Sequence, residues 1–386
     1  MFERLIQILS YDPKNPLIFS SGLFLFLFFG FSFIYMLLQH RSNLRILFVT
    51  LFSYYFYYKS SGFYFFLLAV ITTSDYFIAE AIGRIKGDSD VKTRKMKMLM
   101  VASLCIDLGF LAYFKYTNFF AGLIADLIGK NFQPWDIFLP VGISFFTFQS
   151  MSYVIDVYRG KIKPLGSLMD YAFYVSFFPQ LVAGPIVRAT DFAPQIRKPV
   201  VITREMFARG VYFIMIGLFK KAVISDYISL NFVDRIFDNP TLYSGFENLL
   251  GVYGYAMQIY CDFSGYSDMA IGIALLLGFH FPLNFNAPYK SDSITDFWRR
   301  WHISLSTWIR DYIYISLGGN RKGKRRQYIN LVITMLLGGL WHGASLNFVA
   351  WGGIHGLGLV GHKYLSQEVL HHDRHYHPHG WRKVVA

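Results

Sequence analysis

The chain has 386 residues, of which 54% are hydrophobic, 19% are aromatic and only 16% are charged. Because soluble domains carry about 25% charged residues, this composition excludes an ordinary soluble protein and indicates a protein whose solvent is lipid. The excess of 37 Lys and Arg over 24 Asp and Glu is typical of the positive cytoplasmic loops of membrane proteins, and we expect no nucleic-acid partner.

An uncharged run from Leu17 to Gln39 is the first predicted membrane helix. Its roughly 23 residues can cross a hydrocarbon core of about 30 Å, and its length argues against a cleaved signal peptide. Several later segments are short or interrupted by Gly and Pro, so we expect roughly nine to eleven membrane-embedded helices, some broken or re-entrant, in one domain over residues 1–386. These segments begin near Ile46, Gly62, Met98, Phe138, Met169, Met206, Leu249, Ile271, Leu331 and Ser345.

Two basic segments predict the topology. They run from Arg84 to Lys97 (RIKGDSDVKTRKMK) and from Gly318 to Arg326 (GGNRKGKRR). Segments rich in Lys and Arg stay on the cytoplasmic side of a membrane. Counting helices back from the first of them places the N-terminus outside the cytoplasm.

Polar residues inside apolar segments are few in the front half of the chain and collect in the back half, from about Phe178. A polar group at membrane depth is costly and usually marks a site or pathway, so Asp262 and Asn286 are predicted to bind substrate. For Asp262, a partner in the backbone at a helix break is an equally good interpretation. Pro179 and Pro185 predict a broken or re-entrant helix lining a cavity.

The segment RRWHISLSTWIRDYIYISLGG contains no Pro or Gly over residues 296–314, which predicts one helix. On that helix Arg299, His302, Ser306 and Arg310 would share a polar face. An amphipathic helix at the membrane interface would explain the arginines and tryptophans, but not the histidine. We therefore predict a catalytic role for His302 and substrate-binding roles for Arg299, Ser306 and Arg310.

A second histidine, His342, lies in the apolar segment LLGGLWHGAS. Each glycine costs a helix about 1 kcal/mol relative to alanine, so Gly338, Gly339 and Gly343 indicate that something approaches the backbone closely. An imidazole titrates near neutral pH and suits proton transfer, which favours a functional role over that of a hydrogen-bonded core residue. We predict that His342 is a catalytic base and that Trp341 beside it contacts substrate.

The sequence predicts no metal site. Cys105 and Cys261 lie in apolar segments without metal-binding spacing. The histidine-rich stretch HHDRHYHPHG belongs to a predicted flexible polar tail over residues 367–386 and lacks fixed geometry. The motif GGNRKGKR resembles a phosphate-binding loop, but Arg325 stands where Ser or Thr must hold magnesium.

The segments DFWRRWHISLSTWIRDYIYISLGGNRKG and LLGGLWHGASLNFVAWGGIHGLGL resemble the signature of the membrane-bound O-acyltransferases (MBOAT). FFPQLVAGPIVR and YCDFSGYSDMAIGIALLLGFHFPLNFNAPY are similar to the alginate and peptidoglycan O-acetylation branch. The resemblance runs from about Phe138 to Gly361. It implies that His342 matches the invariant histidine and His302 a second conserved polar position. It also implies an all-α helical bundle around a transmembrane tunnel.

This branch usually continues through further helices beyond the equivalent of Ala386, so we expect the bundle to lack helices of longer relatives. Ser316 stands where relatives often have Pro. The resemblance implies a multi-pass protein of the bacterial inner membrane that moves an acetyl group from cytosolic acetyl-CoA to an extracytoplasmic polysaccharide. A periplasmic or membrane partner acetyltransferase that passes the group on is equally compatible.

The donor's phosphates predict a basic binding surface, for which Arg321 and Lys322 are the candidates, unless that run only determines topology. Two other activities of the same family stay open, D-alanyl transfer and lipid acyl transfer. A transporter or flippase is the alternative from another class, against which the lack of two similar halves argues. The final acceptor is left open among alginate, peptidoglycan and other polysaccharides.

Overall fold

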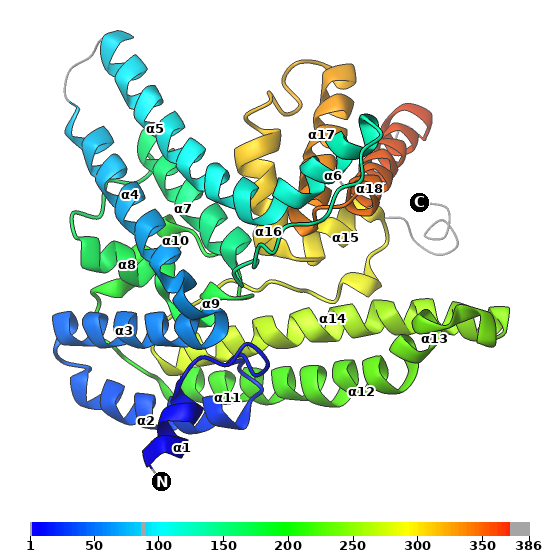
Figure 1. Cartoon of the computed structure of the whole chain (residues 1–386). Helices are drawn as coiled ribbons and strands as arrows, with labels where there is room; N and C mark the ends of the chain where they lie inside the picture. Colours follow the sequence, from blue (N-terminus) through cyan, green and yellow to red (C-terminus); the bar gives the residue numbers. More distant parts are fainter. Residues whose placement is uncertain (1, 86–89, 371–386) are drawn as a thin grey trace. The chain divides into compact units, whose positions relative to one another are not determined.

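The computed structural model describes residues 2–85 and 90–370. Every regular element among them is a helix, which confirms the predicted all-α class (Figure 1). The helices form two compact units, Met1–Leu108 with Pro140–Pro282 and Gly109–Leu139 with Leu283–Ala386. The predicted single domain stays a prediction. Most of the predicted tail, residues 371–386, lies outside the described part, and residues 367–369 belong to a helical turn.

The first unit contains the longest helix, α14. Its elements are α1 (Phe2–Leu9), α2 (Gly22–Leu38), α3 (Ser42–Ser61), η1 (Gly62–Tyr64), α4 (Phe65–Arg84), most of α5 (Asp90–Leu111), α7 (Ile143–Tyr158), α8 (Leu168–Ser176), α9 (Phe178–Leu181), α10 (Ala189–Ile196), α11 (Arg204–Leu218), η3 (Phe219–Ser225), α12 (Asp226–Ile228), η4 (Ser229–Val233), α13 (Asp234–Asp238), η5 (Pro240–Leu242) and α14 (Gly245–Leu276).

The second unit is built around the packed pair α17 and α18. Its elements are the end of α5, η2 (Ala112–Tyr116), α6 (Thr117–Leu127), η6 (Pro288–Lys290), α15 (Ile294–Arg300), α16 (Ile303–Ile309), η7 (Arg310–Tyr314), α17 (Lys324–His342), α18 (Leu346–Tyr364) and η8 (Leu365–Val369).

Two helical stretches of the described chain are long and apolar enough to cross a membrane, judged by length and composition. They are Ser42–Arg84 and Asp90–Leu127. The first consists of α3 and α4, which meet at Gly62, where φ is +62° and a short 3-10 turn interrupts the α-helix. The helix α2 is a shorter apolar helix. The predicted count of nine to eleven membrane helices stays a prediction.

The separate helix predicted near Ile271 is wrong, because α14 runs unbroken over 32 residues from Gly245 to Leu276. Ser244 caps its start, with Glu247 completing a capping box, and no proline interrupts it. The helices α11 and α14 lie side by side (Figure 1). They approach so closely that a β-carbon on Gly265 would lie 2.8 Å from the carbonyl oxygen of Gly217. The small residues in this segment thus serve helix packing.

The helix break predicted around Pro179 and Pro185 is confirmed, whereas a cavity lined by this segment stays a prediction. The helix α9 has only four residues, and the backbone from residue 182 to residue 188 is irregular. Phe178, which opens α9, is fully buried and contacts the rings of Phe24 and Phe56. The predicted basic segment at residues 84–97 is partly helical, because Lys92 to Lys97 lie in the first turns of α5.

Candidate active site

The predicted single helix over residues 296–314 is wrong, because it breaks at His302. The helix α15 ends at Arg300, Trp301 is extended with φ −97° and ψ 128°, and α16 begins at Ile303. His302 itself has φ 42° and ψ 57°, in the left-handed region. A residue with a side chain pays about 1–3 kcal/mol for such a conformation, and strained positions of this kind gather at functional sites.

Asn284 holds the break in place. Its backbone carbonyl accepts the Ile303 N–H at 2.8 Å, and its side-chain oxygen accepts the Ser304 hydroxyl at 2.8 Å. The same oxygen lies 3.2 Å from Nδ1 of His302, a residue only 1% exposed. An amide oxygen only accepts, so this contact places the imidazole proton on Nδ1 and makes Nε2 the acceptor atom.

The break separates the four residues that the sequence placed on one face. His302 is buried, whereas Arg299 and Arg310 are exposed and Ser306 is half-buried. The His302 ring faces Trp341, with ring centres 5.9 Å apart, rather than the two arginines. The histidine and the arginines therefore belong to two neighbouring parts of the second unit.

His342 is the last residue of α17, and tryptophan rings surround it. Its ring centre lies 5.0 Å from that of Trp341 and 5.0 Å from that of Trp351 in α18. Trp341 therefore lies between the two predicted catalytic histidines and contacts both rings. The structure brings His302, which precedes α16, together with Trp341 and His342 at the end of α17.

The glycines beside His342 accommodate α18. A methyl group on Gly339 would overlap the carbonyl oxygen of Phe348 and touch the backbone of Gly352, and one on Gly343 would overlap the Phe348 ring. By contrast, a methyl group on Gly338 would meet only the Ile309 side chain at an ordinary 3.7 Å. The predicted close approach is confirmed at Gly339 and Gly343, where α18 is the neighbour, and it is wrong at Gly338.

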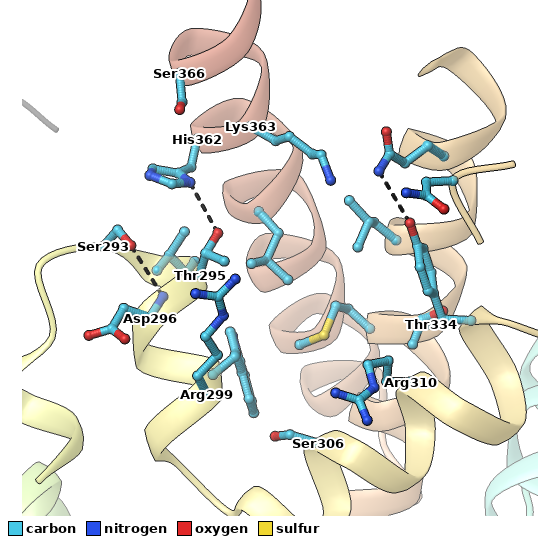
Figure 2. Close-up of a pocket in the computed structure, with 18 of the residues that line it drawn as sticks. Ser293, Thr295, Asp296, Arg299, Ser306, Arg310, Thr334, His362, Lys363 and Ser366 are labelled. Carbon is cyan, nitrogen blue, oxygen red and sulfur yellow. Dashed lines mark hydrogen bonds between the residues drawn. The ribbon is translucent and has the colours of Figure 1, made fainter. Parts of the chain in front are cut away.

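A cavity of about 1130 Å³ lies within the second unit, between α15, α16, α17 and α18. Arg299, Ser306 and Arg310 line it, together with Lys363 of α18 (Figure 2). Arg310 bonds Asp311 at 2.7 Å, and this hydrogen bond raises the pKa of the Arg310 guanidinium above its ordinary value. Pockets that hold drug-sized ligands measure about 300–1,000 Å³, so this cavity can enclose a large one.

Trp298 connects the lining of the cavity with the aromatic rings around His342. This side chain lines the cavity, and its ring centre lies 5.7 Å from that of Trp351 and 5.2 Å from that of His355. Trp351 in turn contacts His342. Among the described residues, Nε1 of Trp298 and Nδ1 of His355 are buried without a hydrogen-bond partner. Buried polar atoms of this kind are rare and mark places where a ligand atom can bond.

Three other predicted residues of the second unit are not part of this cluster. Asn286 is exposed, and its backbone N–H donates to Arg300 at 2.9 Å. Arg321 and Lys322 are exposed in the loop before α17 and do not line the cavity, although the neighbouring Asn320 does. Asp262 belongs to the first unit.

The helix break expected near Asp262 is wrong, because this residue lies inside the continuous α14. Its carboxylate pairs with Lys221 of η3 at 2.5 Å, and Lys221 also pairs with Asp226 at 2.7 Å. A salt bridge with a neighbouring helix therefore takes the place of the backbone partner considered from the sequence.

Sequence reasoning missed Lys115, Tyr116, Trp298, Trp351 and His355. The signal for Lys115 was present, because it is a charged residue within the apolar stretch LGFLAYFKYTNFF. The three aromatic and histidine residues near His342 carry no such signal, since they occur among many other aromatic residues.

Comparison with known proteins decides the family. The sequence model described as MBOAT, membrane-bound O-acyltransferase family, matches residues 162–374. The chain belongs to this family. The match covers all of α15 to α18, and so the two histidines and the cavity lie inside it.

The names of individual relatives of this MBOAT protein mention different polymers. The probable alginate O-acetylase AlgI of Pseudomonas aeruginosa is 44% identical over 351 residues, which are 89% of this chain and 65% of that protein. The peptidoglycan O-acetyltransferase of Helicobacter pylori is 36% identical over 94% of this chain and 73% of its own length. The teichoic acid D-alanyltransferase of Bacillus subtilis is 32% identical over 58% of each chain. This chain thus spans about two thirds of the length of its first relatives.

No group of three or more His, Cys, Asp or Glu side chains that could hold a metal ion occurs among the described residues. The four basic side chains that line the cavity outnumber its two acidic ones, and they are Arg299, Arg300, Arg310 and Lys363 against Asp292 and Asp296. Arg300 pairs with Asp296 at 2.6 Å. The lining is therefore suited to an anionic ligand.

Proposed function

We propose that this MBOAT protein transfers an acetyl group from acetyl-CoA to a hydroxyl group on the far side of the inner membrane. The observation that carries the proposal is the convergence of His302 and His342 on Trp341, beside a large cavity with a basic lining. The names of the relatives, an alginate O-acetylase and a peptidoglycan O-acetyltransferase, support acetyl as the group and a polysaccharide as the acceptor.

His342 acts as the general base in this reaction. It takes the proton of the acceptor hydroxyl while that oxygen attacks the thioester carbonyl carbon, and the resulting tetrahedral oxyanion collapses with loss of the CoA thiolate. The protonated imidazole then returns the proton to the thiolate, so that the products are the acetyl ester and free CoA. A positioned base of this kind contributes about 10²–10⁴-fold to the rate.

His302 orients a reactant and does not stabilise the negative charge of the tetrahedral oxyanion. Its Nδ1 lies against the side-chain oxygen of Asn284 and carries the proton of the neutral ring. Nε2 is then the acceptor nitrogen and cannot donate a hydrogen bond to an oxyanion. Trp298 Nε1 is a donor that the cluster offers to a substrate oxygen, and His355 Nδ1 is a second one when the neutral ring carries its proton on that nitrogen. A donor placed at a developing oxyanion is worth about 2.7–4 kcal/mol.

The donor enters the cavity with its phosphates against Arg299 and Arg310. Arginine binds phosphate through paired N–H donors, and Arg299 has no ion-pair partner among the described residues. Arg321 and Lys322, in the loop before α17, attract the polyanion from solution and need not touch it. A hydroxyl on a partner acetyltransferase is the alternative acceptor, because a neutral serine or sugar hydroxyl has the same chemistry.

Release of free thiol from acetyl-CoA in proteoliposomes tests the proposal. We expect thiol release that depends on added acceptor polysaccharide and on an intact His342. Thiol release with D-alanyl carrier protein, and none with acetyl-CoA, would assign the chain to the D-alanyl branch. Movement of a solute across the vesicle without any thiol release would favour the transporter interpretation.

Removing an arginine that lines the cavity should selectively weaken the binding of acetyl-CoA. Arg310→Ala removes a charge-assisted contact worth about 1.5–3 kcal/mol, so the KM for acetyl-CoA should rise roughly 10- to 100-fold, with a smaller change in kcat. The matched control is Arg326→Ala, an exposed arginine of α17 that does not line the cavity. An unchanged KM in a normally expressed Arg310→Ala protein would limit Arg310 to a structural role.

The topology proposal places the N-terminus outside and the start of α5 in the cytosol. In a background with Cys105→Ser and Cys261→Ser, a Lys92→Cys variant should resist a membrane-impermeant maleimide in intact cells and react after permeabilisation. Phe63→Cys, which is exposed next to the turn at Gly62, is the control and should react in intact cells. Labelling of Lys92→Cys from the periplasmic side would overturn this orientation.

A further inference from the structure

Lys115 is a charged side chain inside an apolar membrane-length stretch, Asp90–Leu127. It is partly buried, and its ammonium group donates a hydrogen bond to the carbonyl oxygen of Trp341. The same ammonium lies 5.5 Å from the centre of the Trp341 ring. A lysine at membrane depth is costly and usually has a functional partner. Here the partner is the residue that precedes His342.

Tyr116 binds the carbonyl of α17 that precedes the carbonyl of Trp341. Its hydroxyl donates to the carbonyl oxygen of Leu340 at 2.7 Å. The last four carbonyls of an α-helix have no partner within the helix, and positive charge is favoured at that end by the helix dipole. Lys115 and Tyr116 therefore cap the end of α17, at the two carbonyls that come directly before His342.

Lys115 and Tyr116 belong to one wide turn of the backbone. Ala112–Tyr116 forms the π-helical turn η2, a wider turn than that of an α-helix and one that is frequent at functional sites. The turn delivers one ammonium and one hydroxyl group to consecutive carbonyls of a helix far away in the sequence.

We propose that Lys115 is a positioning residue for His342, and that Tyr116 assists it. The inference rests on the proposed acyl transfer at His342. Because the Trp341 ring contacts both His302 and His342, holding the Trp341 backbone fixes the relation between the two imidazoles. A reacting group displaced by about 1 Å can lose about 10²-fold in rate, even when the mutated residue does not touch the substrate.

Kinetics of three variants separate positioning from simple stabilisation. Lys115→Met keeps the length of the side chain and removes the charge, so kcat should fall roughly 10²-fold while the KM for acetyl-CoA stays within about twofold. Lys115→Arg should recover most of the lost kcat, and Tyr116→Phe should show a smaller loss. Lys130→Met, at an exposed lysine after α6, is the matched control and should behave as wild type.

A readout independent of turnover is the rate at which diethyl pyrocarbonate modifies His342, followed by peptide mass spectrometry. We expect a several-fold change in Lys115→Met and none in Lys130→Met. A wild-type kcat and an unchanged modification rate in Lys115→Met would overturn the inference, and so would a loss that Lys115→Arg does not relieve. If the wild-type protein showed no acetyl transfer, while Lys115→Met still changed the rate at which His342 is modified, the proposed acyl transfer would be wrong. Lys115 would remain the residue that positions His342.

Discussion

Replacing His342 by alanine should abolish acetyl transfer while the protein still inserts, folds and binds its donor. The expected fall in kcat is about 10²–10⁴-fold, the contribution of a positioned general base. The His342 side chain makes no hydrogen bond to another described residue, and its ring contacts the rings of Trp341, Phe348 and Trp351. Its removal therefore leaves no buried polar group without a partner, and the loss should lie in the chemical step.

The measurement compares acetyl transfer and donor binding in detergent-purified variants. His342→Asn serves beside His342→Ala, because it keeps a planar polar side chain and lacks the basic nitrogen. His40→Ala, an exposed histidine of the first unit, is the control and should retain full activity. Substantial turnover by either His342 variant, with an unchanged melting temperature, would remove His342 from its proposed role as base.

His302→Ala should be less severe than His342→Ala if His302 only orients a reactant. The alanine variant also loses the contact with Asn284 and keeps the left-handed backbone, so part of its effect will be on stability. A His302→Gly variant relieves the backbone strain and isolates the loss of the imidazole. An equal loss of kcat in His302→Gly and His342→Ala would make His302 a second essential group.

The sequence singled out candidate site residues, but their arrangement differs from the one that it predicted. His342 was visible because an imidazole between apolar residues and glycines is costly unless it has a role. The break at His302 was not visible, since neither Gly nor Pro marks it. Its cause is tertiary: Asn284, from a different segment, supplies the acceptor for Ile303 and the contacts for Ser304 and His302.

Pairing between residues far apart in the sequence also explains the remaining differences between the predictions from sequence and the structure. Lys115 could have been noticed as a charge in an apolar run, but only the fold shows that its partner is the carbonyl of Trp341, 226 residues further along the chain. In the same way, the pairing of Asp262 with Lys221 depends on the side-by-side packing of α14 with η3. Composition and spacing identify costly residues, and the partner that offsets the cost comes from the fold.

Gly338 and Gly339 allow the sharpest test of the packing beside His342. Gly339→Ala should strongly destabilise the second unit and remove activity, because its new methyl group overlaps the carbonyl oxygen of Phe348 in α18. A backbone atom cannot move aside as a side chain can, so α17 and α18 must separate at this crossing. Overpacking usually costs about 1–3 kcal/mol, and a clash with backbone should lie at or above the upper end of that range.

The neighbouring Gly338→Ala is the matched control. Its methyl group meets only Ile309 at 3.7 Å, and alanine is about 1 kcal/mol better than glycine inside a helix. We therefore expect an unchanged or raised melting temperature and near wild-type activity for Gly338→Ala, against a lowered melting temperature for Gly339→Ala. Both can be measured by thermal unfolding in detergent together with the thiol-release assay. If Gly338→Ala were stable but inactive, the glycines would be needed for access of substrate to His342, and the packing explanation would be incomplete.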